Sequence, residues 1–280
     1  MVLIIKRLIL TKGSDKLNLD LRDKIAIITG GSDGIGKETA RIMSEEGAKV
    51  SIFARNMENL MKSKSEIEKI TSNEVDIYSV DVRDQQSIKL SVEKVIKKHG
   101  DIDILVNNAG TSSAHPIMDI TDEIMSDDIG TKLYGAIYMI QSVVPSMKKK
   151  GGGSIINITT PGGKASGANT IPTSVSRAAG ISMTKATSKE LSAFNIRVNT
   201  VCVGLFKSGQ HRKRYEKRLN NEPNLTLDDF YQELGKDVPL GQRVGEAEEA
   251  ASLITYLSSG QANYITGTAI NIDGGASPVV

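Results

Sequence analysis

Glycines recur in the segment 29–36, which reads Thr-Gly-Gly-Ser-Asp-Gly-Ile-Gly, and such a segment can hold a phosphate group. It follows the apolar, β-branched run 24–28, which is typical of a strand buried on both faces, and it precedes a helical pattern over 35–46. Glycines let the backbone approach a pyrophosphate, and the free amides at a helix start face the anion. This context favours a dinucleotide site over an ordinary tight turn, with Gly30, Ser32, Asp33, Gly34, Ile35 and Gly36 as its residues.

The end of the next strand, expected over 49–53, indicates which dinucleotide binds. An acidic residue at that place usually holds a ribose 2′-hydroxyl, whereas an arginine accommodates a 2′-phosphate. Here the strand runs into Ala54, Arg55 and Asn56, without an acid. Arg55 therefore favours NADP(H), although NAD(H) stays possible. Asp33 argues the other way because its charge would repel a 2′-phosphate, and the alternative interpretation of Arg55 is a solvated charge at a strand end.

The rest of the chain alternates between strand and helix patterns. Strands are expected over 76–80, 104–107, 154–159, 195–204 and 269–272, and helices over 57–71, 85–99, 121–147, 174–193 and 247–258. Such alternation implies right-handed crossovers and a doubly wound parallel sheet with helices on both faces. We expect an α/β protein with one Rossmann-type domain over residues 19–280 and an N-terminal arm over residues 1–18.

Ligands of doubly wound sheets lie beyond the carboxyl ends of the strands. The residues at these ends are small or polar, and the Asp81 carboxylate is placed to meet an adenine. One site is therefore predicted from separate places in the chain. Besides the glycine-rich segment, its residues are Asp81, Val82, Asn108, Ala109, Gly110, Thr160 and Gly204.

The alternation stops over residues 205–240, a polar and charged segment with helical patterns at 211–219 and 226–234. A long insertion at the mouth of a site suggests a lid or substrate loop. Its basic run at 211–214 either meets an acidic substrate or forms a solvated helix face.

The composition argues against several classes of function. A net charge of only +2 gives no electrostatic reason to expect nucleic acid or an anionic membrane as a partner. The single cysteine, Cys202, lies in an apolar run and the three histidines are scattered, so we expect neither a disulfide nor a metal site. The apolar start of the chain is interrupted by charges and falls short of the roughly 20 residues that span a bilayer. No small-residue cleavage site follows it, so we expect a cytoplasmic protein.

Several motifs together resemble those of the short-chain dehydrogenase/reductase family. They occur in family order over residues 20–280 and comprise Thr29-Gly30-x-x-x-Gly34-x-Gly36, Asp81-Val82, Asn107-Asn108-Ala109-Gly110, Ile196-Arg197-Val198-Asn199, and Ile265-Thr266-Gly267 with Asp273-Gly274-Gly275. The resemblance implies a single Rossmann domain with a seven-stranded parallel sheet. It also implies an NAD(P)(H) cofactor, hydride transfer to or from a small carbonyl or alcohol, and self-association as a dimer or tetramer.

The catalytic residues of that family are replaced in this sequence. In the family a tyrosine transfers the proton, a lysine holds the ribose and lowers the tyrosine pKa, a serine orients the carbonyl, and an asparagine completes a water relay. These positions fall on Thr173, Arg177, Thr160 and Lys132, in that order, and residues 150–197 contain no tyrosine. Thr160 keeps a hydroxyl and Arg177 can bridge ribose hydroxyls. Thr173 is the serious change, because an aliphatic hydroxyl is a much weaker acid than a phenol.

Lys132 is the first candidate for a different proton donor, because the pKa of a lysine falls when it is desolvated beside a cation such as Arg177. Tyr134 and Tyr138 lie on the same predicted helix, but Tyr134 should face elsewhere. Alternatively, Lys132 is a surface cation or pairs with Asp127 or Asp128 one turn back.

Three interpretations of the whole chain stay open. The first is an oxidoreductase with a non-standard proton donor. The second is an NADP(H)-binding sensor or scaffold subunit without turnover. The third is a non-redox enzyme that uses the Lys132 and Arg177 cations on an anionic substrate.

Overall fold

The computed structural model describes residues 18–280 of the chain. The N-terminal arm expected over residues 1–18 therefore lies outside the described residues, except for Asn18. The Asn18 carbonyl accepts a hydrogen bond of 2.7 Å from Gln261 Nε2.

Seven parallel strands form one sheet in the order β3-β2-β1-β4-β6-β8-β9. The order runs outward from β1 to β2 and β3 on one side and from β4 to β9 on the other, which is the doubly wound arrangement that the alternating pattern predicts. The central strands β1 and β4 are buried along their whole length, as their continuous apolar runs require. The strands are β1 (Ile25–Thr29), β2 (Lys49–Ala54), β3 (Val75–Ser79), β4 (Ile104–Asn107), β6 (Gly153–Thr159), β8 (Ile196–Val203) and β9 (Ala269–Ile272).

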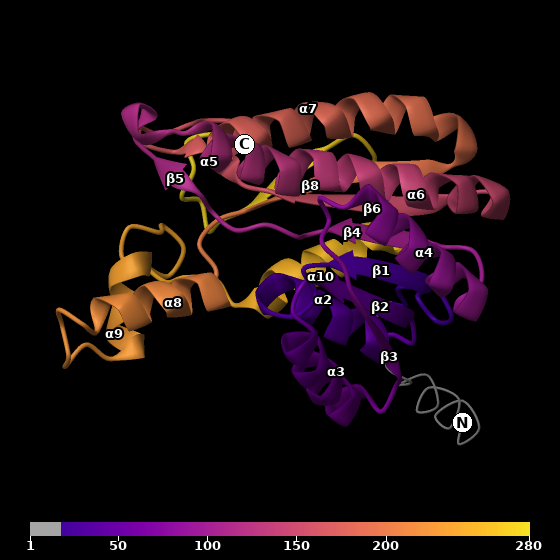
Figure 1. Cartoon of the computed structure of the whole chain (residues 1–280), viewed down its shortest axis with the longest axis horizontal. Helices are drawn as coiled ribbons and strands as arrows, with labels where there is room; N and C mark the ends of the chain where they lie inside the picture. The colour runs from indigo at the N-terminus through magenta and orange to yellow at the C-terminus, as the bar shows by residue number, and fades with distance from the viewer. Residues whose placement is uncertain (1–17) are drawn as a thin grey trace, which may run out of the picture.

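Helices cover both faces of this sheet (Figure 1). One face carries α2 (Gly34–Glu45), α3 (Met57–Thr71) and α10 (Ala247–Ser258), and the other carries α4 (Gln85–His99), α6 (Gly135–Lys150) and α7 (Thr173–Leu191). Polar side chains fix where helices begin. Asp84, for example, accepts hydrogen bonds from the amides of Gln86 and Ser87 at the start of α4. Short 3₁₀ turns are η1 (Ile117–Asp119), η3 (Pro161–Gly163), η4 (Ser192–Phe194) and η5 (Gly260–Ala262).

The long helix expected over 121–147 is present but contains a π turn. It consists of α5 (Asp122–Ile129), the π segment η2 (Gly130–Tyr134) and then α6. A π turn inserts an extra residue into the helix and occurs frequently at functional sites. Hydrophobic periodicity does not reveal it, because the apolar stripe continues on both sides. Lys132 lies within this turn and is buried there.

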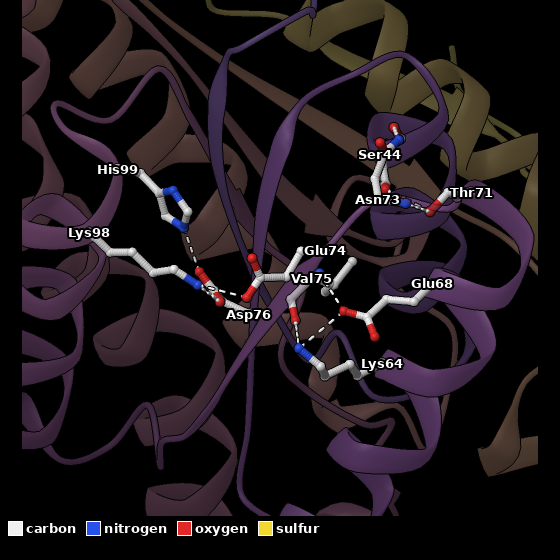
Figure 2. Close-up of polar contacts among 10 residues, drawn as sticks. All are labelled: Ser44, Lys64, Glu68, Thr71, Asn73, Glu74, Val75, Asp76, Lys98 and His99. Atoms are coloured by element: carbon white, nitrogen blue, oxygen red, sulfur yellow. Dashed lines mark hydrogen bonds and ion pairs between the residues drawn. The ribbon is translucent and has the colours of Figure 1, made fainter.

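The edge strand β3 is protected by charged side chains (Figure 2). Lys64 Nζ donates to the Val75 carbonyl at 2.7 Å, and the Val75 amide donates to Glu68 Oε1 at 2.9 Å. On the next residue, Asp76 contacts Lys98 Nζ at 2.6 Å and His99 Nε2 at 2.5 Å. Lys64 and Glu68 satisfy the backbone groups of Val75 that an exposed edge would offer to another strand, and the contacts of Asp76 join α4 to the sheet.

The insertion after β8 forms two helices, α8 (Gly209–Arg218) and α9 (Leu227–Gly235), close to the expected positions. In Figure 1 they lie at the same end of the molecule as the start of α5. A small antiparallel pair, β5 (Ala114–His115) and β7 (Ile171–Pro172), was not expected and also lies there. Within residues 18–280, no helix is both long enough and apolar enough to cross a membrane.

Candidate active site

The glycine-rich turn between β1 and α2 packs against the end of β4. Asn108 Nδ2 donates to the carbonyls of Thr29 at 3.1 Å and Gly30 at 3.2 Å. A Cβ at Gly36 would lie 2.4 Å from Asn108 Nδ2 and 2.4 Å from the Gly30 carbonyl, so a side chain does not fit there. Thr29 Oγ1 accepts from the amides of Asn108 and Ala109, both at 3.0 Å. The start of α2 therefore lies beside the carboxyl ends of β1 and β4, an arrangement that fits the pyrophosphate of a dinucleotide.

Helix α8 begins directly beside this turn. Asp33 Oδ1 accepts from the Gly34 amide at 2.8 Å, while Oδ2 faces Gly209, where a Cβ would lie only 1.8 Å away. On the other side, Gln210 Oε1 accepts from the Ser112 amide at 2.9 Å. The start of α8 thus bridges the glycine-rich turn and the loop after β4. Ser32 and Ile35, the other expected residues of the turn, are partly exposed.

The residues that we expect near the adenosine end of the cofactor have different surroundings in the structure. Arg55 follows β2 and is exposed, as an anion-binding residue requires. The Asp81 carboxylate instead holds Arg83, with Oδ2 2.6 Å from Nη2, and Arg83 also contacts Asp127. The Arg83 guanidinium keeps the pKa of Asp81 below its ordinary value. Val82 is buried and packs against the start of α6. The approach is so close that a Cβ at Gly135 would lie only 2.8 Å from the Val82 side chain.

Lys132 is the central side chain of the site. It is buried with its partner Asp128, each with a side-chain exposure of 2%. The Lys132 ammonium contacts Asp128 Oδ2 and donates to Thr173 Oγ1 at 2.8 Å. Asp128 Oδ1 in turn accepts from Ser176 Oγ at 2.6 Å. Lys132 is therefore no surface cation. It forms the i, i+4 pair with Asp128 that its spacing allows, inside the protein.

The Thr173 hydroxyl has no free hydrogen-bonding capacity. It accepts from Lys132 Nζ at 2.8 Å and from the Ser113 amide at 2.8 Å, and it donates to the Ser113 carbonyl at 2.7 Å. A hydroxyl has one proton to donate and two lone pairs to accept with, and all three are used. Thr173 therefore holds the loop of Ser113 against the π turn and orients Lys132.

Arg177, on α7, lies beside Lys132. Its Nη1 donates to the Ile158 carbonyl at 2.6 Å. A Cβ at Gly110 would lie 3.1 Å from Lys132 Cγ and 3.3 Å from Arg177 Nη2, so Gly110 packs closely against both cations. The two cations line one pocket together with Asn107. Arg177 Nε and Asn107 Oδ1 are buried without a hydrogen-bond partner in the part of the chain that the structure describes.

Burial and charge change the acidity of both cations. Desolvation, followed by the repulsion of Arg177, lowers the pKa of Lys132 to about 8, although Asp128 opposes the change. This is the direction that the sequence predicts for a lysine desolvated beside Arg177. Desolvation also lowers the pKa of Arg177 to about 10, so Arg177 stays charged at neutral pH. Lys132 is thus an acid that can release and regain a proton near physiological pH.

Two expected residues are not hydrogen-bonded to this cluster. Thr160 directly follows β6, and within residues 18–280 no hydrogen bond joins its side chain to Lys132, Thr173 or Arg177. Gly204 follows β8, where a Cβ would lie 2.6 Å from the Asp273 side chain. The close approach of the C-terminal segment therefore leaves no room for a side chain at position 204.

Sequence reasoning did not single out Thr29, Ser113 or Ser176 as part of the site. Thr29 ends the strand before the glycines, and its hydroxyl fixes the Asn108 loop. Ser113 contributes backbone groups, for which side-chain type gives no signal. Ser176 lies three residues after Thr173, and residues with this spacing share one face of a helix. That spacing was the signal that could have revealed Ser176.

Comparisons with known proteins agree with this geometry. Residues 30–277 match the family described as enoyl-(acyl carrier protein) reductase. A 3-oxoacyl-[acyl-carrier-protein] reductase, FabG of Thermotoga maritima, is 37% identical over 255 residues, which cover 91% of this chain and 98% of the relative. The chain belongs to the short-chain dehydrogenase/reductase family. It is therefore a short-chain-type oxidoreductase with a nicotinamide cofactor, and the predicted family membership is confirmed.

Two solved structures of this family share its fold over nearly the whole chain. L-Sorbose reductase from Gluconobacter frateurii, complexed with NADPH and L-sorbose, has a TM-score of 0.88 and 29% identity, covering 94% of this chain and 100% of that one. A short-chain oxidoreductase from Pseudomonas aeruginosa PAO1, bound to NADPH, has a TM-score of 0.85 and 28% identity, covering 92% of this chain and 98% of that one. The second is described as containing an atypical catalytic center.

Proposed function

We propose that this short-chain dehydrogenase/reductase reduces a small carbonyl compound with NADPH, and that Lys132 supplies the proton. The cofactor supplies a hydride to the carbonyl carbon when it is bound, and the Lys132 ammonium gives a proton to the carbonyl oxygen. The product is an alcohol, and neutral Lys132 regains its proton afterwards. In the reverse direction, neutral Lys132 accepts the alcohol proton.

The observation that carries this proposal is the state of Lys132. Its ammonium is buried, is held by Asp128 and Thr173, and has a pKa lowered to about 8. A general acid is most effective when its pKa lies near the working pH. An aliphatic hydroxyl cannot serve in this way, and that of Thr173 already donates to the Ser113 carbonyl.

The other residues of the cluster take supporting roles in the proposal. Arg177, beside Lys132, would hold the nicotinamide ribose through its guanidinium, whose Nε has no partner within residues 18–280. Thr160 would orient the substrate carbonyl through its hydroxyl. Thr173 would orient Lys132. In this assignment Thr160, Thr173, Arg177 and Lys132 occupy the family's serine, tyrosine, lysine and asparagine positions, in that order.

NADPH is preferred over NADH in this proposal because Arg55 is exposed at the end of β2. Gly30, Ser32, Asp33, Gly34, Ile35, Gly36, Asp81, Val82, Asn108, Ala109, Gly110, Arg177 and Gly204 would surround the rest of the cofactor. The NADPH complexes of the sorbose reductase and of the Pseudomonas enzyme support this choice. We also propose a cytoplasmic protein that self-associates as a dimer or tetramer, for which light scattering of the purified protein is the test.

The experiment is a panel of small carbonyl compounds assayed by NADPH oxidation, with wild type and Lys132→Met. Methionine has nearly the length of the lysine side chain but lacks the ammonium group that would donate the proton. We expect wild-type turnover, and a loss of roughly 10²- to 10⁴-fold in Lys132→Met with an unchanged NADPH dissociation constant. Lys149→Met, on the exposed end of α6, is the matched control and should behave as wild type.

Two results would contradict the proposal. Turnover retained by Lys132→Met would reject Lys132 as the proton donor. Wild type that binds NADPH but reduces no compound of the panel, and gains activity only after Thr173→Tyr, would indicate a cofactor-binding protein without turnover.

A further inference from the structure

The Asp128 carboxylate is divided between two side chains from different helices. Its Oδ2 contacts the Lys132 ammonium, one turn along the same helix, and its Oδ1 accepts from Ser176 Oγ of α7 at 2.6 Å. Thr173 Oγ1 lies 3.4 Å from Oδ2 on the same side. Both carboxylate oxygens are therefore held, and Asp128 is 4% exposed.

Few other charges face Lys132. Arg177 of α7 repels its ammonium, and Asp127 attracts it weakly from the helix surface, where its side chain is 64% exposed and pairs with Arg83. Asp128 is the one buried carboxylate among these neighbours within the described part of the chain. Without it, Lys132 and Arg177 would be two adjacent buried cations.

Buried charges keep one geometry only when every partner is fixed. Ser176 lies in the first turn of α7. Its hydroxyl also contacts the Thr173 carbonyl at 3.1 Å. The position of α7 therefore determines where Asp128 points, and Asp128 determines where the Lys132 ammonium points. Asp128 and Lys132, one turn apart, both lie on the side of their helix that α7 covers.

We infer that Asp128 is a positioning residue for the reaction, which fixes the direction of the Lys132 ammonium and keeps it protonated, and that Ser176 holds Asp128 in turn. The inference rests on the proposed role of Lys132. Asp128 itself does not touch substrate or cofactor. It acts through Lys132 alone, so its loss should change proton transfer and leave cofactor binding unaffected.

The test measures the protonation of Lys132 without turnover. Competitive acetylation with a trace of acetic anhydride, read by mass spectrometry as a function of pH, gives the midpoint at which the Lys132 amine becomes reactive. In Asp128→Asn, which keeps the shape and removes the charge, we expect this midpoint to fall by at least about one pH unit. Asp127→Asn, the matched control, should stay within about 0.3 unit of wild type, and Asp128→Glu, which keeps the charge, within about half a unit.

The kinetic readout is kcat against KM. Asp128→Asn should lower kcat roughly tenfold or more and move the upper pH limit of reduction down with the acetylation midpoint, while the NADPH dissociation constant stays the same. Ser176→Ala should lower kcat severalfold with little change in KM, and it keeps the test available if Asp128→Asn does not fold.

An acetylation midpoint unchanged in Asp128→Asn would overturn the inference, as would wild-type kcat in Ser176→Ala. A midpoint that shifts in a protein without carbonyl turnover would uphold the role of Asp128 toward Lys132 and reject the proposed function. The two proposals can therefore fail separately.

Discussion

Thr173 Oγ1 and Lys132 Nζ lie 2.8 Å apart, although 41 positions separate the two residues in the sequence. The bond joins the first residue of α7 to the π turn of the preceding helix. Because the hydroxyl also bonds both backbone groups of Ser113, three segments meet at one oxygen atom.

The pH dependence of reduction should report Lys132. Reduction needs the protonated amine, whose pKa is lowered to about 8 by burial and by Arg177. The value of kcat/KM for carbonyl reduction should therefore be constant at lower pH and fall as pH rises through about 8, whereas alcohol oxidation should rise over the same interval. Initial rates in buffers of constant ionic strength measure both. A reduction rate that stays constant up to about pH 10 would exclude Lys132 as the acid.

Thr173→Val should destabilise the protein, because valine has nearly the same shape but no hydroxyl. Lys132 Nζ loses one acceptor and the Ser113 amide loses its acceptor, each inside the protein. We expect the free energy of unfolding to fall by about 1–3 kcal/mol, together with a lower kcat. Urea unfolding measures the first effect. Thr173→Ser keeps the hydroxyl and should lose only about 1 kcal/mol for the methyl group. A valine variant as stable as wild type would show that the hydroxyl contributes nothing.

Arg55→Ala should weaken NADPH binding and leave NADH binding unchanged, because only NADPH carries the 2′-phosphate that a guanidinium holds. A charged hydrogen bond of this kind corresponds to an increase of roughly tenfold or more in the NADPH dissociation constant. Cofactor fluorescence titrations at fixed salt give both constants. The opposite variant, Asp33→Asn, removes a negative charge from the glycine-rich turn and should tighten NADPH binding. Equal effects of Arg55→Ala on the two cofactors would refute the assignment.

Gly209→Ala should disturb the contact between α8 and the glycine-rich turn. The added methyl group would lie 1.8 Å from Asp33 Oδ2, so either the Asp33 carboxylate turns away or the start of α8 moves from the glycine-rich turn. We expect a severalfold increase in the NADPH dissociation constant and a higher KM. Gly167→Ala is the matched control, since its methyl group meets only Thr170 Cγ2 at an ordinary 3.7 Å. The double variant Asp33→Ala with Gly209→Ala removes the clash and should restore the position of α8. Persistence of the defect in the double variant would indicate a cause other than this contact.

The sequence predicted the architecture because each strand and helix carries its own local pattern. β1 is a continuous apolar run, and the helical pattern over 85–99 coincides with α4. The seven parallel strands and the two helical layers followed from these patterns together with right-handed crossovers. The positions of α8 and α9 were also predicted, but the contact of α8 with Asp33 was not, because it depends on how the insertion folds back.

The site was only partly predictable for a physical reason. The i, i+4 spacing of Asp128 and Lys132 is visible in the sequence, yet such a pair is usually exposed, and its burial depends on α7, which begins at Thr173. The pair β5 and β7 has two residues in each strand, too few for a period to appear. The bond between Ser113 and Thr173 uses backbone groups that every residue has.

The π turn makes the position of the candidate proton donor depend on a single residue of chain length. One residue corresponds to a rotation of about 100° around an α-helix. Deleting Leu133, which follows Lys132 in the π segment, would turn both Asp128 and Lys132 by this rotation relative to α6 and so away from α7. A related protein with one residue fewer at this place would keep the same sheet and glycine-rich turn, and would have to obtain its proton from another side chain.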